Sequence, residues 1–169
     1  MALTHFDEAG KARMVDVSAK PTTERIATAR ATVTMAPATF SRLVDKSLEK
    51  GDVLEVARLA GIMGAKRTSE LIPLCHPLPL SAVTVEFELR DEAAAVDIEV
   101  TVKTTAKTGV EMEAMTGAAV SALTIYDMCK SVDRSITVSD LRLIHKAGGA
   151  SGAYTASGEE APKGQGAIE

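Results

Sequence analysis

The chain has 169 residues, of which 46% are hydrophobic and 3% aromatic, and its formal net charge is −4. This length and apolar content suffice for one domain with a buried core, whereas the negative charge and the few aromatic rings disfavour nucleic acid or an anionic membrane as a partner. No apolar run approaches the roughly 18 residues of a membrane span, the N-terminus lacks a secretory signal, and the two cysteines have no framework spacing, so we expect a cytoplasmic location.

Four elements are expected in the first half of the chain. Residues 11–20 form a candidate strand, and residues 25–35 alternate small apolar with mostly polar side chains, which predicts a strand with one buried face. Residues 37–46 are expected to form a short helix. Residues 52–71 have the apolar spacing of a helix whose apolar side chains cover most of its circumference, which indicates that more than the sheet covers it.

The second half of the chain contains the clearest strand signal. Residues 83–90 and 96–103 each alternate apolar and polar side chains around the polar pair Asp91–Glu92, which predicts an antiparallel hairpin with one solvated face. The pattern of residues 110–132 predicts a long helix. Its small middle residues would allow another element to pack closely against it. Residues 136–146 predict the last strand.

The expected order of the main elements is β-α-β-β-α-β. The simplest packing of this order is an α+β ferredoxin-like sandwich, an antiparallel sheet with the helices on one face. We expect one catalytic domain over residues 1–155. Residues 156–169 mix Gly, Pro, Glu and Lys without periodicity, which predicts a disordered tail.

The segment of residues 72–80 contains three prolines, which hold it extended between a helix and a strand. This rigid loop presents Cys75 and His76, and a histidine suits either proton transfer or contact with a phosphate. The structural alternative is a buried cysteine beside a histidine that hydrogen-bonds to the backbone.

Asp127 and Lys130 are i,i+3 neighbours on the second long helix, close enough to exchange a proton or to form an ion pair. Their apolar surroundings predict shifted pKa values, whereas the alternative is a solvated ion pair at a helix end. Glu113 lies on the same face of the helix, but about 21 Å of helix separates it from Asp127. Either one end of the helix is catalytic, or two subunits bring opposite ends together.

Two lysines are candidate anion contacts. Lys50 precedes a helix start, where free backbone N–H groups favour an anion, and Lys146 introduces the glycine-rich residues 147–152. Metal binding is not expected, because the candidate ligands show no familiar zinc-site spacing. Those candidate ligands are Cys75, His76, Glu113, Asp127, Cys129 and His145.

Several stretches together resemble the cyclic pyranopterin monophosphate synthases, the C proteins of molybdenum cofactor biosynthesis. The resemblance covers nearly the whole chain apart from the tail, and it comprises residues 14–20, 50–52, 65–68, 71–77, 108–115, 122–130 and 146–152.

The resemblance implies a lyase that converts a cyclic dihydroguanosine triphosphate into cyclic pyranopterin monophosphate and releases pyrophosphate. It also implies a ferredoxin-like subunit and a homohexamer built as a trimer of dimers, and we expect the site at a subunit interface. We expect no cofactor, because the reaction needs several proton transfers, for which paired acid and base groups matter more than a redox cofactor. The acid/base residue carries over onto Asp127, with Lys130 beside it and Lys50 nearby. The substrate contacts carry over onto Leu74, Cys75, His76, Met112 and Glu113.

A mechanistic hypothesis follows from this resemblance. Asp127 and Lys130 would move protons at the base and ribose, with Lys130 acting as a base through a lowered pKa. Lys50, His76 and Lys146 would hold the triphosphate and stabilise the departing pyrophosphate. A non-catalytic ligand sensor and a metal-assisted phosphohydrolase remain open as alternatives.

Overall fold

A computed structural model describes residues 5–7 and 9–159 of the chain. Within these residues the strands are β1 (Thr23–Thr34), β2 (Leu80–Arg90), β3 (Ala95–Ala106), β4 (Thr137–Ala147) and β5 (Tyr154–Thr155). The α-helices are α1 (Pro37–Val44), α2 (Val53–Lys66), α3 (Thr68–Leu71) and α4 (Glu111–Cys129), and a 3₁₀ turn, η1 (Asp91–Ala93), joins β2 to β3.

The strands form one sheet in the order β2-β3-β1-β4-β5, and every neighbouring pair is antiparallel. The main elements therefore follow the β-α-β-β-α-β order with β1 and β3 in the centre, which confirms the predicted ferredoxin-like α+β fold. The predicted hairpin is also confirmed, because β2 pairs with β3 along its length, with Val85 opposite Val100.

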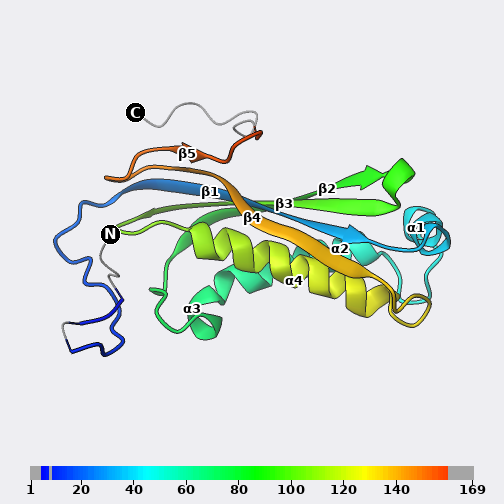
Figure 1. Ribbon diagram of the computed structural model, residues 1–169, viewed down its shortest axis with the longest axis horizontal. Coiled ribbons are helices and arrows are strands. Elements are labelled where there is room, and N and C mark those ends of the chain that lie inside the picture. The colour runs from blue at the N-terminus through cyan, green and yellow to red at the C-terminus, as the bar shows by residue number, and fades with distance from the viewer. Residues whose placement is uncertain (1–4, 8, 160–169) are drawn as a thin grey trace.

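Helices α2 and α4 lie together against one face of the sheet (Figure 1). The inner face of β1 consists of small side chains that are fully buried, namely Ala27, Ala29, Ala31 and Val33. The two helices also approach each other closely, because a Cβ added at Gly61 of α2 would lie 2.2 Å from the Ser121 hydroxyl of α4. The small middle residues of α4 thus have the close neighbour that the sequence predicted.

The boundaries of both long helices differ from the predicted ones. The helix expected over residues 52–71 ends at Lys66, and Arg67, with φ −108° and ψ 12°, separates it from α3. Ile72 then adopts an extended conformation, as a residue before a proline usually does. The helix expected over residues 110–132 spans Glu111–Cys129.

The strand expected over residues 11–20 does not form. These residues are irregular apart from a single bridge between Phe6 and Ala12. Side chains hold the segment instead of strand partners, since the Lys107 ammonium donates to the Ser18 carbonyl at 2.7 Å. Both edges of β1 are already occupied by β3 and β4, which leaves no edge of that strand for a further partner.

The end of the described chain returns along the sheet. The two-residue strand β5 pairs with the end of β4, and the Glu159 carboxylate contacts Arg30 and Arg142, each at 2.5 Å. The predicted disordered tail falls mostly on residues 160–169, which lie outside the described residues, and it stays a prediction. Across residues 5–7 and 9–159, no helix is long and apolar enough to cross a membrane.

Candidate functional site

A pocket of about 280 Å³ lies where α4 begins. Three segments that are far apart in the sequence line it: the irregular N-terminal segment, the proline-flanked segment before β2, and the connection from β3 into α4. Its lining residues are His5, Val15, Val17, Lys20, Leu74, Cys75, His76, Leu78, Thr108, Gly109, Glu111, Met112 and Glu113. All five substrate contacts that the resemblance implied are therefore in this one pocket.

The proline-flanked segment presents Cys75 and His76 to the pocket, as the sequence predicted. His76 Nε2 lies 2.9 Å from the Val15 carbonyl oxygen, and since a carbonyl only accepts, this ring nitrogen donates. The neutral ring then has Nδ1 as its acceptor. His76 thus hydrogen-bonds to the backbone, as the structural alternative expected, and it also lines the pocket. Its role in proton transfer or phosphate contact stays a prediction. Burial raises the pKa of the Cys75 thiol, and the nearby Glu113 carboxylate adds to the effect.

Glu113 is the most strongly perturbed acid of the pocket. Its side chain projects from the first turn of α4 and the residue is only 4% exposed. Burial, with a smaller contribution from the charge of Glu111, raises the pKa of Glu113 to about 7. A carboxyl group with this pKa exchanges protons near neutral pH, which suits it to donate or accept one.

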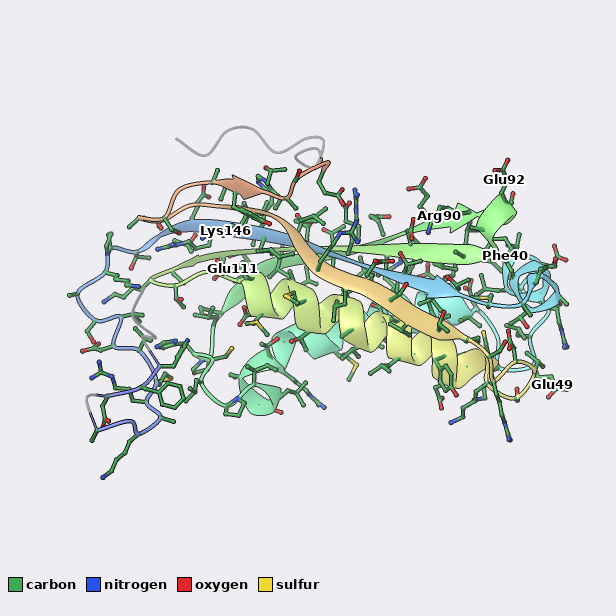
Figure 2. The ribbon with its side chains drawn as sticks, in the orientation of Figure 1. Phe40, Glu49, Arg90, Glu92, Glu111 and Lys146 are labelled. Atoms are coloured by element: carbon green, nitrogen blue, oxygen red, sulfur yellow. The ribbon has the colours of Figure 1, made fainter. Side chains whose placement is uncertain are left out.

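Lys146 lies beside the same end of α4. Its ammonium is 3.5 Å from the Glu111 carboxylate and donates to the Ser151 hydroxyl at 2.7 Å. Figure 2 shows Lys146 and Glu111 near the start of α4, far from Glu49 and Phe40 at the other end of the molecule. Lys146 and the pocket are therefore neighbours, joined through Glu111.

A second cluster, formed by Lys50, Asp127 and Lys130, lies at the C-terminal end of α4. The Lys130 ammonium is 2.6 Å from one Asp127 oxygen, and the Lys50 ammonium is 3.6 Å from the other. Contact with Lys130, and then the charge of Lys50, lowers the pKa of Asp127. The cluster carries two cations and one anion on a half-exposed surface, so it suits contact with a phosphate group.

The predicted properties of Asp127 and Lys130 need one correction. Their side chains are 59% and 50% exposed, so this is the solvated ion pair at a helix end that the sequence left as the alternative. Contact with Asp127 raises the pKa of Lys130, whereas the mechanistic hypothesis required a lowered one. Apolar neighbours in the sequence did not bury the pair, because those neighbours point into the core while Asp127 and Lys130 point outward.

One chain does not bring the predicted site residues together. Leu74, Cys75, His76, Met112 and Glu113 line the pocket, whereas Lys50, Asp127 and Lys130 lie about 21 Å of helix away, at 1.5 Å per residue. His76 and Asp127 are thus at opposite ends of α4. The sequence predicted, from the length of helix between them, that Glu113 and Asp127 could not meet within one chain, and the fold confirms this separation.

Sequence reasoning missed several parts of the site. It assigned no role to Lys20, Val15 or Val17, although they lie in one of the stretches that carried the resemblance. Two candidate metal ligands lie elsewhere, since Cys129 is fully buried in the core and His145 contacts Thr155. Among the described residues, no three histidine, cysteine or acidic side chains converge as metal ligands.

Comparison with known proteins gives a consistent result. The model of the MoaC family matches residues 14–149. The chain is 62% identical over 152 residues to the cyclic pyranopterin monophosphate synthase of Heliobacterium modesticaldum, an alignment that covers 90% of this chain and 96% of that protein. It is 57% identical over 154 residues to the synthase of the same name from Parvibaculum lavamentivorans, covering 91% and 96%. The synthase of Thermomicrobium roseum is 54% identical over 159 residues, covering 94% and 96%.

Proposed function

The chain belongs to the MoaC family, and on that premise we propose that it is a cyclic pyranopterin monophosphate synthase, a lyase of molybdenum cofactor biosynthesis. Its substrate is (8S)-3',8-cyclo-7,8-dihydroguanosine 5'-triphosphate, and its products are cyclic pyranopterin monophosphate and pyrophosphate. The reaction opens a purine ring, closes a pyran ring and forms a cyclic phosphate, so it needs several proton transfers.

The observation that carries this proposal is the division of the candidate residues between the two ends of α4. The pocket at the start of the helix combines apolar side chains, such as Leu74 and Met112, with polar ones that include the titrating carboxyl of Glu113, which suits a heterocyclic base. The cluster at the end of the helix places two lysines around one carboxylate, which suits a triphosphate. A cyclic guanosine triphosphate has both of these parts.

We propose that two copies of the chain complete each site, in a cytoplasmic homohexamer built as a trimer of dimers. One copy contributes the pocket with His76 and Glu113, and its partner contributes Lys50, Asp127 and Lys130. Exposed apolar side chains on the helix layer support an assembly, because Leu59 of α2 and Leu123 of α4 are 60% and 61% exposed. Burial of such side chains between copies stabilises an oligomer.

The protonation states suggest how the groups divide the work. Asp127 is a carboxylate and would accept protons, while Lys130 is an ammonium and would donate them or stabilise the departing pyrophosphate. Their ion pair lowers the pKa of Asp127 and raises that of Lys130, so each proton transfer becomes easier once substrate separates the two groups. Lys50 and Lys146 would hold the phosphates. His76 and Glu113 would bind the base and exchange protons with it.

Incubation of the purified protein with the cyclic nucleotide tests the proposal directly. We expect stoichiometric release of pyrophosphate and formation of cyclic pyranopterin monophosphate, and we expect the activity to survive exhaustive chelation. A ligand sensor would bind the nucleotide and release no pyrophosphate, which would refute the proposed function. Loss of activity on chelation, with recovery on addition of a divalent ion, would favour a metal-assisted reaction instead.

A further inference from the structure

Arg25 occupies an unusual position on strand β1. The side chains that alternate along the inner face of this strand are small and fully buried, from Ala27 to Val33. Arg25 is two residues before Ala27 and therefore projects from the same face, beneath the helix layer. It pairs in register with Thr104 of β3, near the end of the sheet where α4 begins. A guanidinium group on the buried face of a strand requires a physical explanation.

The guanidinium of Arg25 connects two loops. Its Nη1 donates to the Gly148 carbonyl at 3.3 Å, and its Nη2 donates to the Lys107 carbonyl at 3.5 Å. Gly148 follows strand β4, and Lys107 lies in the connection from β3 into α4. One side chain thus contacts the backbone of two segments that are about 40 residues apart in the sequence.

The loop after β4 is built around this guanidinium. Gly149 has φ +78°, and a Cβ added there would lie 1.6 Å from Arg25 Nη1. Any other residue at position 149 would be strained in its backbone and would collide with the arginine. The loop therefore packs tightly against the Arg25 guanidinium.

Both segments that the Arg25 guanidinium contacts lead directly to the candidate site. Lys146 is two residues before Gly148, and the connection after Lys107 contributes Thr108, Gly109 and Glu111 to the pocket. The Lys146 ammonium and the Glu111 carboxylate meet at 3.5 Å. Displacement of either loop would therefore move a charged group at the edge of the pocket.

The contacts of Arg25 stabilise the fold only weakly. The two hydrogen bonds are long, and the Nε atom is buried without a hydrogen-bond partner in the described part of the chain. A buried donor without a partner destabilises a protein, so stability alone does not account for an arginine at this position.

We propose that Arg25 is a positioning residue for the synthase reaction: its guanidinium braces the loop after β4 and the connection into α4, and so fixes Lys146 and Glu111 beside the pocket. This inference rests on the proposed function. A lysine does not replace the arginine, because a single ammonium lacks the planar fork that reaches two carbonyl groups in fixed directions.

Hydrogen exchange tests the bracing without any assay of activity. In Arg25→Met, which keeps the apolar stem and removes the guanidinium, we expect faster amide exchange in residues 107–113 and 146–152 and no change elsewhere. Arg25→Lys should behave in the same way. The matched control is Arg90→Ala, because Arg90 is an ion-paired arginine at the opposite end of the molecule (Figure 2). Unchanged exchange in both loops of Arg25→Met would overturn the proposal.

Kinetics and chemical rescue test the consequence for the site. We expect Arg25→Met to release pyrophosphate about 10- to 100-fold more slowly than the wild type, since small displacements of positioned groups have effects of this size. Low-millimolar guanidinium, far below denaturing concentrations, should restore part of that activity and return loop exchange towards the wild-type rate. Wild-type turnover in Arg25→Met, or rescue of turnover with the loops still mobile, would refute a positioning role.

The exchange and kinetic experiments together distinguish failure of this inference from failure of the proposed function. If the wild-type protein releases no pyrophosphate, the proposed function fails, while the exchange experiment still decides whether Arg25 braces the loops. If the wild type is active and Arg25→Met has wild-type exchange and turnover, only the positioning role fails. If Arg25→Met does not fold, Gly149→Ala tests the same contact from the other side, and unchanged exchange in that variant would overturn the proposal.

Discussion

The Lys50 ammonium joins both the main chain and the side chain of Asp127: it donates to the Asp127 carbonyl oxygen at 2.8 Å and lies 3.6 Å from the carboxylate. Carbonyl groups in the last turn of a helix have no partner within the helix, and this one receives a cation, which the helix dipole also favours. The contact connects the loop before α2 to the end of α4. It therefore holds the cationic cluster in place before any substrate arrives.

We predict that Asp127→Asn folds normally and forms no detectable product. Asparagine keeps the shape of the side chain and removes the negative charge, so neither proton acceptance nor the ion pair with Lys130 survives. General acid–base groups contribute about 10²- to 10⁴-fold to a rate, and we expect a loss at least that large in pyrophosphate release. Asp91→Asn, a change at an exposed residue of η1, should retain full activity. Turnover near the wild-type rate in Asp127→Asn would refute the role assigned to this residue.

Sequence patterns predicted the fold well because strands β2 and β3 have one buried and one more exposed face. The alternation of Val85 and Glu86 along β2 directly reflects that geometry, whereas β1 has buried side chains on both faces, such as Ala27 and Thr28. The irregular segment of residues 11–20 could not be predicted in the same way. It also contains apolar residues, but its position depends on distant groups such as His76, which hydrogen-bonds to Val15.

The sequence named candidate site residues one by one, but it did not predict how they are arranged in space. Motifs identified Glu113, His76 and Lys130 as candidates, and the i,i+3 spacing also predicted the pair of Lys130 with Asp127. Other partners are distant in the sequence, as with Glu111 and Lys146. Glu113 and Asp127 lie on the same side of α4, so the burial of one and the exposure of the other depend on which distant segments cover each end of the helix. The position of Arg25 had a sequence signal, namely a charged residue in phase with buried small ones on a predicted strand.

We predict that Glu113 titrates close to neutral pH, and that Glu113→Gln changes how stability depends on pH. The folded-state pKa is about 7, above the ordinary 4.5, so the native state holds this proton over a range in which the unfolded chain has released it. The stability that the protonated side chain contributes is complete at low pH. It falls as pH rises from about 4.5 to about 7, by an amount on the order of 3 kcal/mol.

Chemical denaturation of the two proteins between pH 4.5 and pH 8 measures this effect. Glu113→Gln cannot ionise, so its stability relative to the wild type should increase across the interval and then level off. Selective ¹³C labelling of the glutamate side chains would give the pKa itself. Glu55→Gln, at an exposed position on α2, should follow the wild-type curve. A stability difference independent of pH would contradict a raised pKa for Glu113.

We predict that Gly61→Ala destabilises the protein by about 1 to 2 kcal/mol, although alanine is the better helix former by about 1 kcal/mol. The added Cβ would lie 2.2 Å from the Ser121 hydroxyl and 3.1 Å from the Gly117 carbonyl oxygen. Ser121 is fully buried and donates to the Ala57 carbonyl at 3.0 Å, so it cannot rotate away without losing that bond. Urea unfolding measures the change in the free energy of unfolding. The double variant Gly61→Ala, Ser121→Ala should lose less free energy of unfolding than the two single variants lose together.

We predict that two inactive variants of this chain restore activity when they are assembled together, provided that each lacks a different half of the site. Asp127→Asn lacks the cationic cluster's carboxylate, and Glu113→Gln lacks the titrating carboxyl of the pocket. In a symmetric dimer with two shared sites, a mixed pair has one site with both changes and one site with neither. Random pairing in a co-expressed sample would then give roughly a quarter of the wild-type pyrophosphate release per subunit.

The matched control combines two changes within the same half. Asp127→Asn co-expressed with Lys50→Ala should stay inactive, because every mixed site retains a defect in the cluster at the end of α4. This comparison holds oligomer formation and expression constant and varies only which half-site is damaged. If both combinations are inactive, no site is shared and each chain contains its complete site. Since about 21 Å of helix separates Glu113 from Asp127, one of these two residues would then have no role in the reaction. Recovery in the first combination alone is the result that a site shared between two copies requires.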